Sequence, residues 1–232
     1  MTTMQKQKFL TFSFDDCEIY DRLLCEMLRK YNLKATFFLI SGQLSLRRAF
    51  HRYGEDTMVE RICPEEIRRT YAGMEVATHT QDHKCSAQDL DTTVLASARY
   101  LSSLCGYEVK GMAYPGGIYT KELVKGLKAA GIRYARTTCV THSFAPPVDW
   151  LTWNPTCKYD DPDIWQLADD FLNLDGSSFS VFHIYGHSYE MTRREKGCDF
   201  GSFEALLQKL SGKDDIVYAT NSEVMELLNS GR

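Results

Sequence analysis

The chain has 232 residues, a mass of 26.6 kDa and a formal net charge of −4. Its composition, 44% hydrophobic and 25% charged, is that of a folded globular protein and excludes a disordered chain. The length favours one domain spanning residues 1–232. The acidic balance offers no basic surface to nucleic acid, so we expect no nucleic-acid partner.

The N-terminus and the cysteines bear on where the protein works. The apolar stretch from Phe9 to Phe14 ends at Asp15 and is too short for a signal peptide or a membrane span. None of the eight cysteines belongs to a CxxC pair, which argues against a zinc ribbon or a redox motif. We therefore expect a cytoplasmic protein with reduced thiols and no membrane partner.

Seven short apolar, β-rich runs alternate with segments of helical spacing along the chain. The runs that we predict as strands are Phe9–Phe14, Ala35–Ile40, Met74–Thr78, Gly111–Tyr114, Arg133–Thr137, Phe179–Ile184 and Ile216–Ala219. The predicted helices are Glu18–Tyr31, Ser86–Cys105, Thr120–Ala130, a segment from near Pro162 to near Leu174, Phe203–Leu210 and Glu223–Asn229. This alternation indicates a parallel sheet, either open and doubly wound or closed into a barrel.

Two long stretches interrupt the alternation. Residues 41–63 are rich in charged side chains, and residues 140–161 carry prolines and aromatic residues. Connections of this length in a compact domain often carry function, and a packed surface excursion is the alternative.

Polar residues gather at the carboxyl ends of four predicted strands, which is where both open α/β sheets and barrels build their sites. They are Asp15 and Asp16 after the first run, His79 and His83 after the third, Tyr114, Pro115 and Gly116 at the end of the fourth, and His187 after the sixth. Four such groups at one end of the sheet predict a functional site there.

The spacing of two histidines suggests metal binding. His79 and His83 are four residues apart, so on a helical turn both imidazoles would face one way and could share an ion. Either Asp15 or Asp16 would complete a three-ligand zinc site of the catalytic kind, with its neighbour facing the water in the fourth position. His187 would then serve as a general acid. The alternative for the aspartates is an acidic loop after a strand.

Several segments match known motifs. Residues 11–16, Thr-Phe-Ser-Phe-Asp-Asp, are similar to T-F-D-D-G, and residues 79–83, His-Thr-Gln-Asp-His, match H-[ST]-x-x-H. Residues 113–117 are similar to R-x-P-[YF]-G, residues 186–190 to a motif with a catalytic histidine, and residues 34–38 read K-A-T-F-F. Over nearly its whole length the chain thus resembles the polysaccharide deacetylases, the NodB-homology family or carbohydrate esterase family four.

The resemblance implies a distorted β/α barrel of seven parallel strands surrounded by helices. It also implies metal-dependent removal of acetyl groups from N-acetylated or O-acetylated sugars. In a cytoplasmic protein, an acetylated mono- or oligosaccharide fits better than an extracellular polymer. One divalent ion is expected, with Zn²⁺ first and Co²⁺, Ni²⁺ or Fe²⁺ as alternatives, because affinity order alone does not settle which metal occupies such a site.

The resemblance also implies residue roles. Those roles are general base for Asp15, metal ligands for Asp16, His79 and His83, general acid for His187, and substrate or oxyanion contacts for Tyr114, Pro115 and Gly116. Trp150 and Trp153 would either stack on the sugar or simply pack.

Two positions depart from the family pattern. Cys17 stands where the motif has glycine, and Ala113 stands where it has the arginine that orients the base. These departures keep two alternatives open. One is hydrolysis of a small non-sugar amide on the same scaffold, and the other is a catalytically weak carbohydrate-binding protein.

Overall fold

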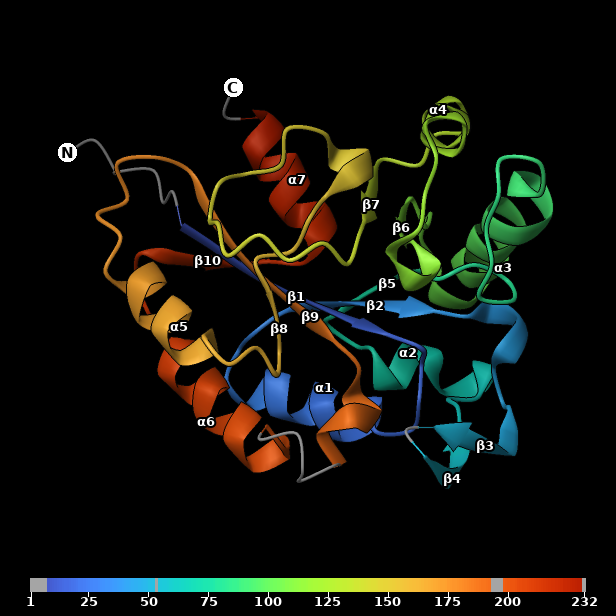
Figure 1. Cartoon of the computed structure of the whole chain (residues 1–232), viewed down its shortest axis with the longest axis horizontal. Coiled ribbons are helices and arrows are strands. Elements are labelled where there is room, and N and C mark those ends of the chain that lie inside the picture. The colour runs from blue at the N-terminus through green and yellow to red at the C-terminus, as the bar shows by residue number, and fades with distance from the viewer. Residues whose placement is uncertain (1–7, 53, 193–197, 231–232) are drawn as a thin grey trace.

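The computed structural model describes residues 8–52, 54–192 and 198–230. Its centre is one curled sheet of parallel strands, with helices packed around it (Figure 1). The strands of this sheet are β1 (Lys8–Asp15), β2 (Ala35–Leu39), β5 (Glu75–Thr78), β6 (Gly111–Ala113), β7 (Tyr134–Arg136), β8 (Cys157–Lys158), β9 (Ser180–Gly186) and β10 (Ile216–Tyr218). A separate antiparallel hairpin consists of β3 (Arg47–Arg52) and β4 (Glu55–Glu60).

Seven α-helices lie in the described part of the chain. They are α1 (Asp21–Lys30), α2 (Ile67–Thr70), α3 (Ala96–Cys105), α4 (Lys121–Ala129), α5 (Ile164–Leu172), α6 (Phe200–Leu210) and α7 (Asn221–Ser230). Shorter turns are η1 (Ser41–Gln43), η2 (Pro64–Glu66), η3 (Asp91–Leu95), η4 (Pro115–Gly117), η5 (Trp150–Thr152) and η6 (Ser188–Thr192).

The sheet order is β7-β6-β5-β2-β1-β9-β8, and β10 pairs with the first half of β1. Every pair in this sheet is parallel. All seven predicted strands are present, and the structure adds the two-residue strand β8. The sheet curls into a half-barrel, as the resemblance implied. Beyond β7, an isolated parallel bridge joins Arg136 to Trp153 in the segment before β8.

Strand β1 shows how the sequence orients the site. Its side chains alternate between the two faces of the sheet. Leu10, Phe12 and Phe14 belong to the large apolar cluster that α1, α5 and α6 complete. The alternate residues face the inside of the half-barrel, where Ser13 accepts a hydrogen bond from Asn221 at the start of α7. The same alternation places the last residue, Asp15, on the inner face.

One local prediction was wrong. The helix expected from Ser86 begins later, because Ser86 and Asp89 hydrogen-bond to each other in a turn and the chain forms the π-helical turn η3 before α3. Residues 41–63, one of the two long stretches that interrupt the alternation, hold the β3–β4 hairpin. Elsewhere the predicted Thr120 cap is confirmed, because its side chain accepts a hydrogen bond from the backbone N–H of Leu123.

Candidate active site

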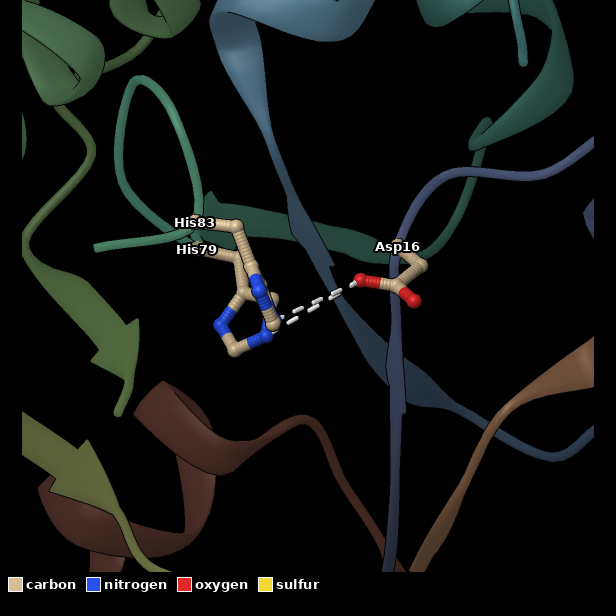
Figure 2. Close-up of side chains that lie close together, drawn as sticks. All are labelled: Asp16, His79 and His83. Atoms are coloured by element: carbon tan, nitrogen blue, oxygen red, sulfur yellow. Dashed lines mark ion pairs between the residues drawn. The ribbon is translucent and has the colours of Figure 1, made fainter. Parts of the chain in front are cut away.

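Three predicted metal ligands meet at the carboxyl ends of β1 and β5. The Nε2 atoms of His79 and His83 both lie 4.0 Å from Oδ1 of Asp16, and Figure 2 shows the two rings turned toward that oxygen. His79 is buried, whereas the side chain of His83 is 44% exposed. The three donor atoms therefore enclose a point that solvent can reach from the side of His83.

The donor set fits a divalent cation. Oδ1 of Asp16 is buried and has no hydrogen-bond partner among the described residues, which is costly unless something else occupies it. Nδ1 of His79 lies 2.9 Å from the carbonyl oxygen of Ala113. Since a carbonyl can only accept, Nδ1 carries the proton and Nε2 presents a free lone pair. Ligands about 2.0–2.1 Å from a tetrahedral zinc lie roughly 3.4 Å apart, so a small inward shift would close the site.

The backbone around these ligands is not helical, contrary to the predicted helical turn over residues 79–83. Thr80 and His83 have positive φ angles of 71° and 64°, and Asp16 and Cys17 have φ angles of 82° and 52°. Such angles are unfavourable for residues with a Cβ, and they cluster at functional sites. Cys17 thus adopts the left-handed conformation for which the family motif uses glycine.

Asp15, the predicted base, is buried against Arg136 of β7. The guanidinium contacts both carboxylate oxygens, with the Nη2–Oδ1 distance at 2.5 Å. Arg136 is itself fully buried and lies over the rings of Phe38 and Tyr185, at 5.4 and 5.0 Å. Burial would raise the pKa of Asp15, but Arg136, with help from His79 and His187, holds it below its usual value. The carboxylate is therefore ionised and fixed in orientation.

Arg136 is the functional candidate that sequence reasoning missed. The available signal was a single charged residue within a short apolar strand, Tyr134-Ala135-Arg136, with nothing to show which partner it faced.

His187, the predicted acid, has its own carboxylate partner. Its Nδ1 lies 3.3 Å from Oε2 of Glu190, and Nζ of Lys158 lies 2.7 Å from the same oxygen. Burial would lower the pKa of His187, but Glu190 and the two site aspartates outweigh that effect and raise it. The side chain is 23% exposed, so a substrate can reach it. Glu190 and Lys158 were also missed: Glu190 ends the matched segment 186–190 but was given no role, and Lys158 belongs to no motif.

Of the three residues after β6 that were predicted to contact substrate or oxyanion, the structure leaves one with a backbone N–H that could serve. The backbone N–H of Tyr114 donates to the carbonyl of Arg136 at 3.0 Å, and Pro115 has no N–H. The phenol of Tyr114 is buried and donates to the carbonyl of Leu151. An oxyanion contact from this loop therefore has to come from the N–H of Gly116, whose φ of 61° suits glycine.

A family model described as polysaccharide deacetylase matches residues 3–135, which is more than half of the chain. The chain belongs to the polysaccharide deacetylase family. No curated protein matches it.

Solved structures share the fold of this deacetylase family member. A Mycobacterium smegmatis protein assigned as a polysaccharide deacetylase is 16% identical, with a TM-score of 0.66, over 100% of this chain and 93% of that one. A Clostridium thermocellum family 4 acetyl xylan esterase, solved with a cobalt ion, is 13% identical, with a TM-score of 0.57, over 95% and 92%. A Streptococcus pyogenes deacetylase, solved with acetate, is 22% identical, with a TM-score of 0.52, and the match covers 61% of each chain.

The two tryptophans that were predicted to stack on a sugar or to pack are held by contacts within the protein. Trp153 is 2% exposed and packs in the core against Tyr134 and His183. Trp150 is half-buried, and its indole N–H donates to Asn229 at the end of α7. Burial leaves Trp153 no face for a sugar, so the geometry favours packing over stacking.

A second cluster of ligand-type side chains lies in the long segment before α5. His142, Asp161 and Asp163 bring donor atoms together, but His142 is exposed and already pairs with Asp161 at 2.8 Å. No atom there is both buried and unpaired. In the part of the chain that the structure describes, no helix has the length and apolar content to cross a bilayer.

Proposed function

We propose that this chain is a metal-dependent hydrolase that removes acetyl groups from N-acetylated or O-acetylated sugars. One observation carries the proposal. In a chain of the polysaccharide deacetylase family, Oδ1 of Asp16 is buried, accepts no hydrogen bond and faces Nε2 of His79 and Nε2 of His83, beside an ion-paired Asp15. Its nearest cationic side chain, Arg61, is 4.0 Å away. An acidic loop without a metal would leave that oxygen unpaired and buried, at a free-energy cost of about 1–3 kcal/mol.

Asp16, His79 and His83 would hold the ion. Two imidazoles and one carboxylate suit Zn²⁺ first, and Co²⁺, Ni²⁺ or Fe²⁺ as alternatives. A divalent ion bound there supplies Lewis acidity, polarising a carbonyl and lowering the pKa of water. The chain itself contributes the rigid placement of the three donors, with His79 fixed by its contact with the carbonyl of Ala113.

Asp15 is placed to accept the proton of the attacking water. Its carboxylate lies 3.8 Å from Nε2 of His79, so it borders the metal ligands without joining their shared centre. Arg136 keeps this carboxylate ionised and prevents its rotation, because it contacts both oxygens. Arg136 is therefore a positioning residue, and Asp15 is the general base.

His187 is placed to donate a proton to the leaving amine or alcohol. Glu190 favours the protonated ring, and Lys158 in turn fixes Glu190. Gly116 would offer its backbone N–H to the developing oxyanion. Together these groups supply a base, an acid and a hydrogen-bond donor for hydrolysis of an acetyl amide or ester.

The test couples metal content to acetate release. We expect about one metal ion per purified chain, release of acetate from acetylated mono- or oligosaccharides, and loss of that release with a chelator. Asp15→Asn should keep the metal and abolish turnover. Metal without acetate release from any acetylated sugar would contradict the proposal and favour a non-sugar amide substrate. A chain that binds no metal under any loading condition would refute it.

A further inference from the structure

The β3–β4 hairpin lies outside the parallel sheet, and one of its faces lines a cavity beside the proposed metal ligands. Side chains alternate between the two faces of a hairpin. Arg48 and Phe50 on β3 share a face with Val59 on β4, the cross-strand partner of Arg48, and Arg61 continues that face beyond β4. All four line the cavity, and Asp16 and His83 line it as well.

The cavity is small and open to solvent. Its volume of about 250 Å³ is below the roughly 300–1,000 Å³ typical of pockets for drug-sized ligands. That volume is on the scale of one sugar residue rather than an oligosaccharide. A molecule bound in this cavity would contact both the hairpin face and the proposed metal-binding residues Asp16 and His83.

The charges around the cavity favour an anion. Asp16 is the one carboxylate among the described lining residues, and a divalent ion would more than neutralise it. The guanidinium of Arg61 is buried and already donates a hydrogen bond to the backbone carbonyl of Asp16, so it is held in place within the protein. Arg48 is exposed and lies 5.3 Å from the ring of Phe50. No carboxylate among the described side chains forms an ion pair with Arg48.

Arg47 provides the contrast within the same strand. It lies on the opposite face of the hairpin, where its guanidinium pairs with Glu60 at 3.7 Å, and it does not line the cavity. Two adjacent arginines thus have different surroundings. One is neutralised by a cross-strand carboxylate, and the other presents its charge to the cavity.

We infer that this cavity binds an acetylated sugar bearing an anionic substituent, a carboxylate or a phosphate group, with Arg48 contacting the anion. The inference rests on the proposed function and names its substrate class. A guanidinium pairs with either anion through two parallel N–H···O bonds, which sets orientation as well as affinity. A cationic sugar would be repelled by Arg48 and by the divalent ion, and a neutral one would leave Arg48 without a partner.

The experiment compares three probes that differ in charge: N-acetylglucosamine, N-acetylglucosamine 6-phosphate and N-acetylmuramic acid. Binding to the metal-loaded protein is measured by calorimetry, and acetate release is measured in parallel. We expect at least one anionic probe to bind about tenfold more tightly than the neutral sugar, since charge-assisted pairs reach that scale. Arg48→Gln should abolish the preference, and Arg47→Gln is the matched control that should retain it.

The outcomes separate the inference from the proposed function. Acetate release without any preference for the anionic probes leaves the function standing and overturns the inference. A preference that survives in Arg48→Gln places the anion on the metal centre instead and also overturns it. If no probe releases acetate, the proposed function loses support, whereas Arg48-dependent binding of an anionic probe still supports the inference. A preference for the phosphate over the carboxylate probe, or the reverse, identifies which anion the cavity takes.

Discussion

Ala113 and Arg136 face each other across the β6–β7 strand pair. Ala113 occupies the position where the family motif has its arginine, and Arg136 is its direct partner on the neighbouring strand. This chain has no guanidinium at position 113, and that of Arg136 reaches Asp15 instead, from one strand further along the sheet. The departure at Ala113 therefore does not leave Asp15, the proposed base, without a cation, which weakens the case for a catalytically weak carbohydrate-binding protein.

The first prediction concerns this relocated arginine. Arg136→Lys keeps a charge but loses Nη1, which donates to the carbonyl of Thr137 and fixes the guanidinium while Nη2 contacts both oxygens of Asp15. We therefore expect kcat to fall about tenfold or more with KM nearly unchanged. Arg136→Ala leaves Asp15 as an unpaired buried charge, which should lower kcat by roughly 10²–10⁴ and the free energy of unfolding by about 3–5 kcal/mol. Steady-state kinetics and chemical denaturation measure the two effects.

The control for Arg136 is a swap. In Ala113→Arg/Arg136→Ala the guanidinium returns to the motif position and the buried volume is roughly conserved. We expect the swap to regain at least about tenfold of the kcat lost in Arg136→Ala, because positioning of the base is the larger effect. Arg133→Ala removes only an exposed ion pair with Glu226 and should leave kcat unchanged. A swap no better than Arg136→Ala would mean that Arg136 serves packing alone.

The second prediction separates metal ligation from proton transfer. His79→Ala should remove most of the bound metal, as measured by elemental analysis, because it deletes a ligand whose tautomer is already set by Ala113. His142→Ala alters the exposed second cluster and should leave the metal content unchanged. Equal metal loss in both variants, or retention in both, would contradict the assignment of Asp16, His79 and His83.

The third prediction concerns pH. The pKa of His187 is raised above its usual value. Turnover should fall when the pH rises above this pKa, because the proposed general acid then loses its proton. Glu190→Gln removes a cause of the shift and should move this alkaline limb to lower pH. Lys158→Met removes a cation that pairs with Glu190, so this carboxylate should act more strongly on His187 and move the limb to higher pH. Shifts of the same sign in both variants would be incompatible with this chain of contacts.

The strands were predictable because burial on both faces of a parallel sheet demands continuous apolar runs, such as Ala35–Leu39. The β3–β4 hairpin was not, because its sequence Arg-Arg-Ala-Phe-His-Arg has no apolar alternation. It lies against the cavity rather than over a second apolar layer. Strand pairing therefore formed there without the signal that sequence reasoning uses.

The cluster of proposed metal ligands could be predicted because its motifs are local, whereas the residues that support it could not. His79 and His83 lie within five residues of each other, but Arg136 is 121 residues from Asp15. Register between β6 and β7 decides which side chain reaches Asp15, and register is a property of the folded sheet. Likewise the left-handed turn at Thr80 replaces the predicted helical turn, yet brings both rings to Asp16.

The last prediction concerns a buried carboxyl behind the site. Asp21, the first residue of α1, is fully buried and accepts hydrogen bonds from Ser188 at 2.5 Å and Tyr71 at 2.7 Å. Burial outweighs these bonds and raises the pKa of Asp21 to about 7. Ser188 directly follows His187, so this contact joins α1 to the segment that carries the proposed acid.

The raised pKa of Asp21 fixes the sign of a stability effect. The folded protein keeps this proton up to about pH 7, whereas an unfolded aspartate releases it near pH 3.9. The folded state thus binds more protons over that interval, and this group's contribution to stability falls as pH rises. The free energy of unfolding of Asp21→Asn, relative to that of the native chain, should therefore increase by up to about 1.4 kcal/mol per pH unit between roughly pH 4 and 7.

Denaturant unfolding of the metal-free protein at several pH values measures this difference. The matched control is Asp214→Asn, an exposed aspartate outside the network. A difference between Asp21→Asn and the native chain that stays constant from pH 5 to 8 would show that Asp21 is ionised in the folded state throughout that range. Ser188 and Tyr71 would then be holding a buried carboxylate rather than a neutral acid.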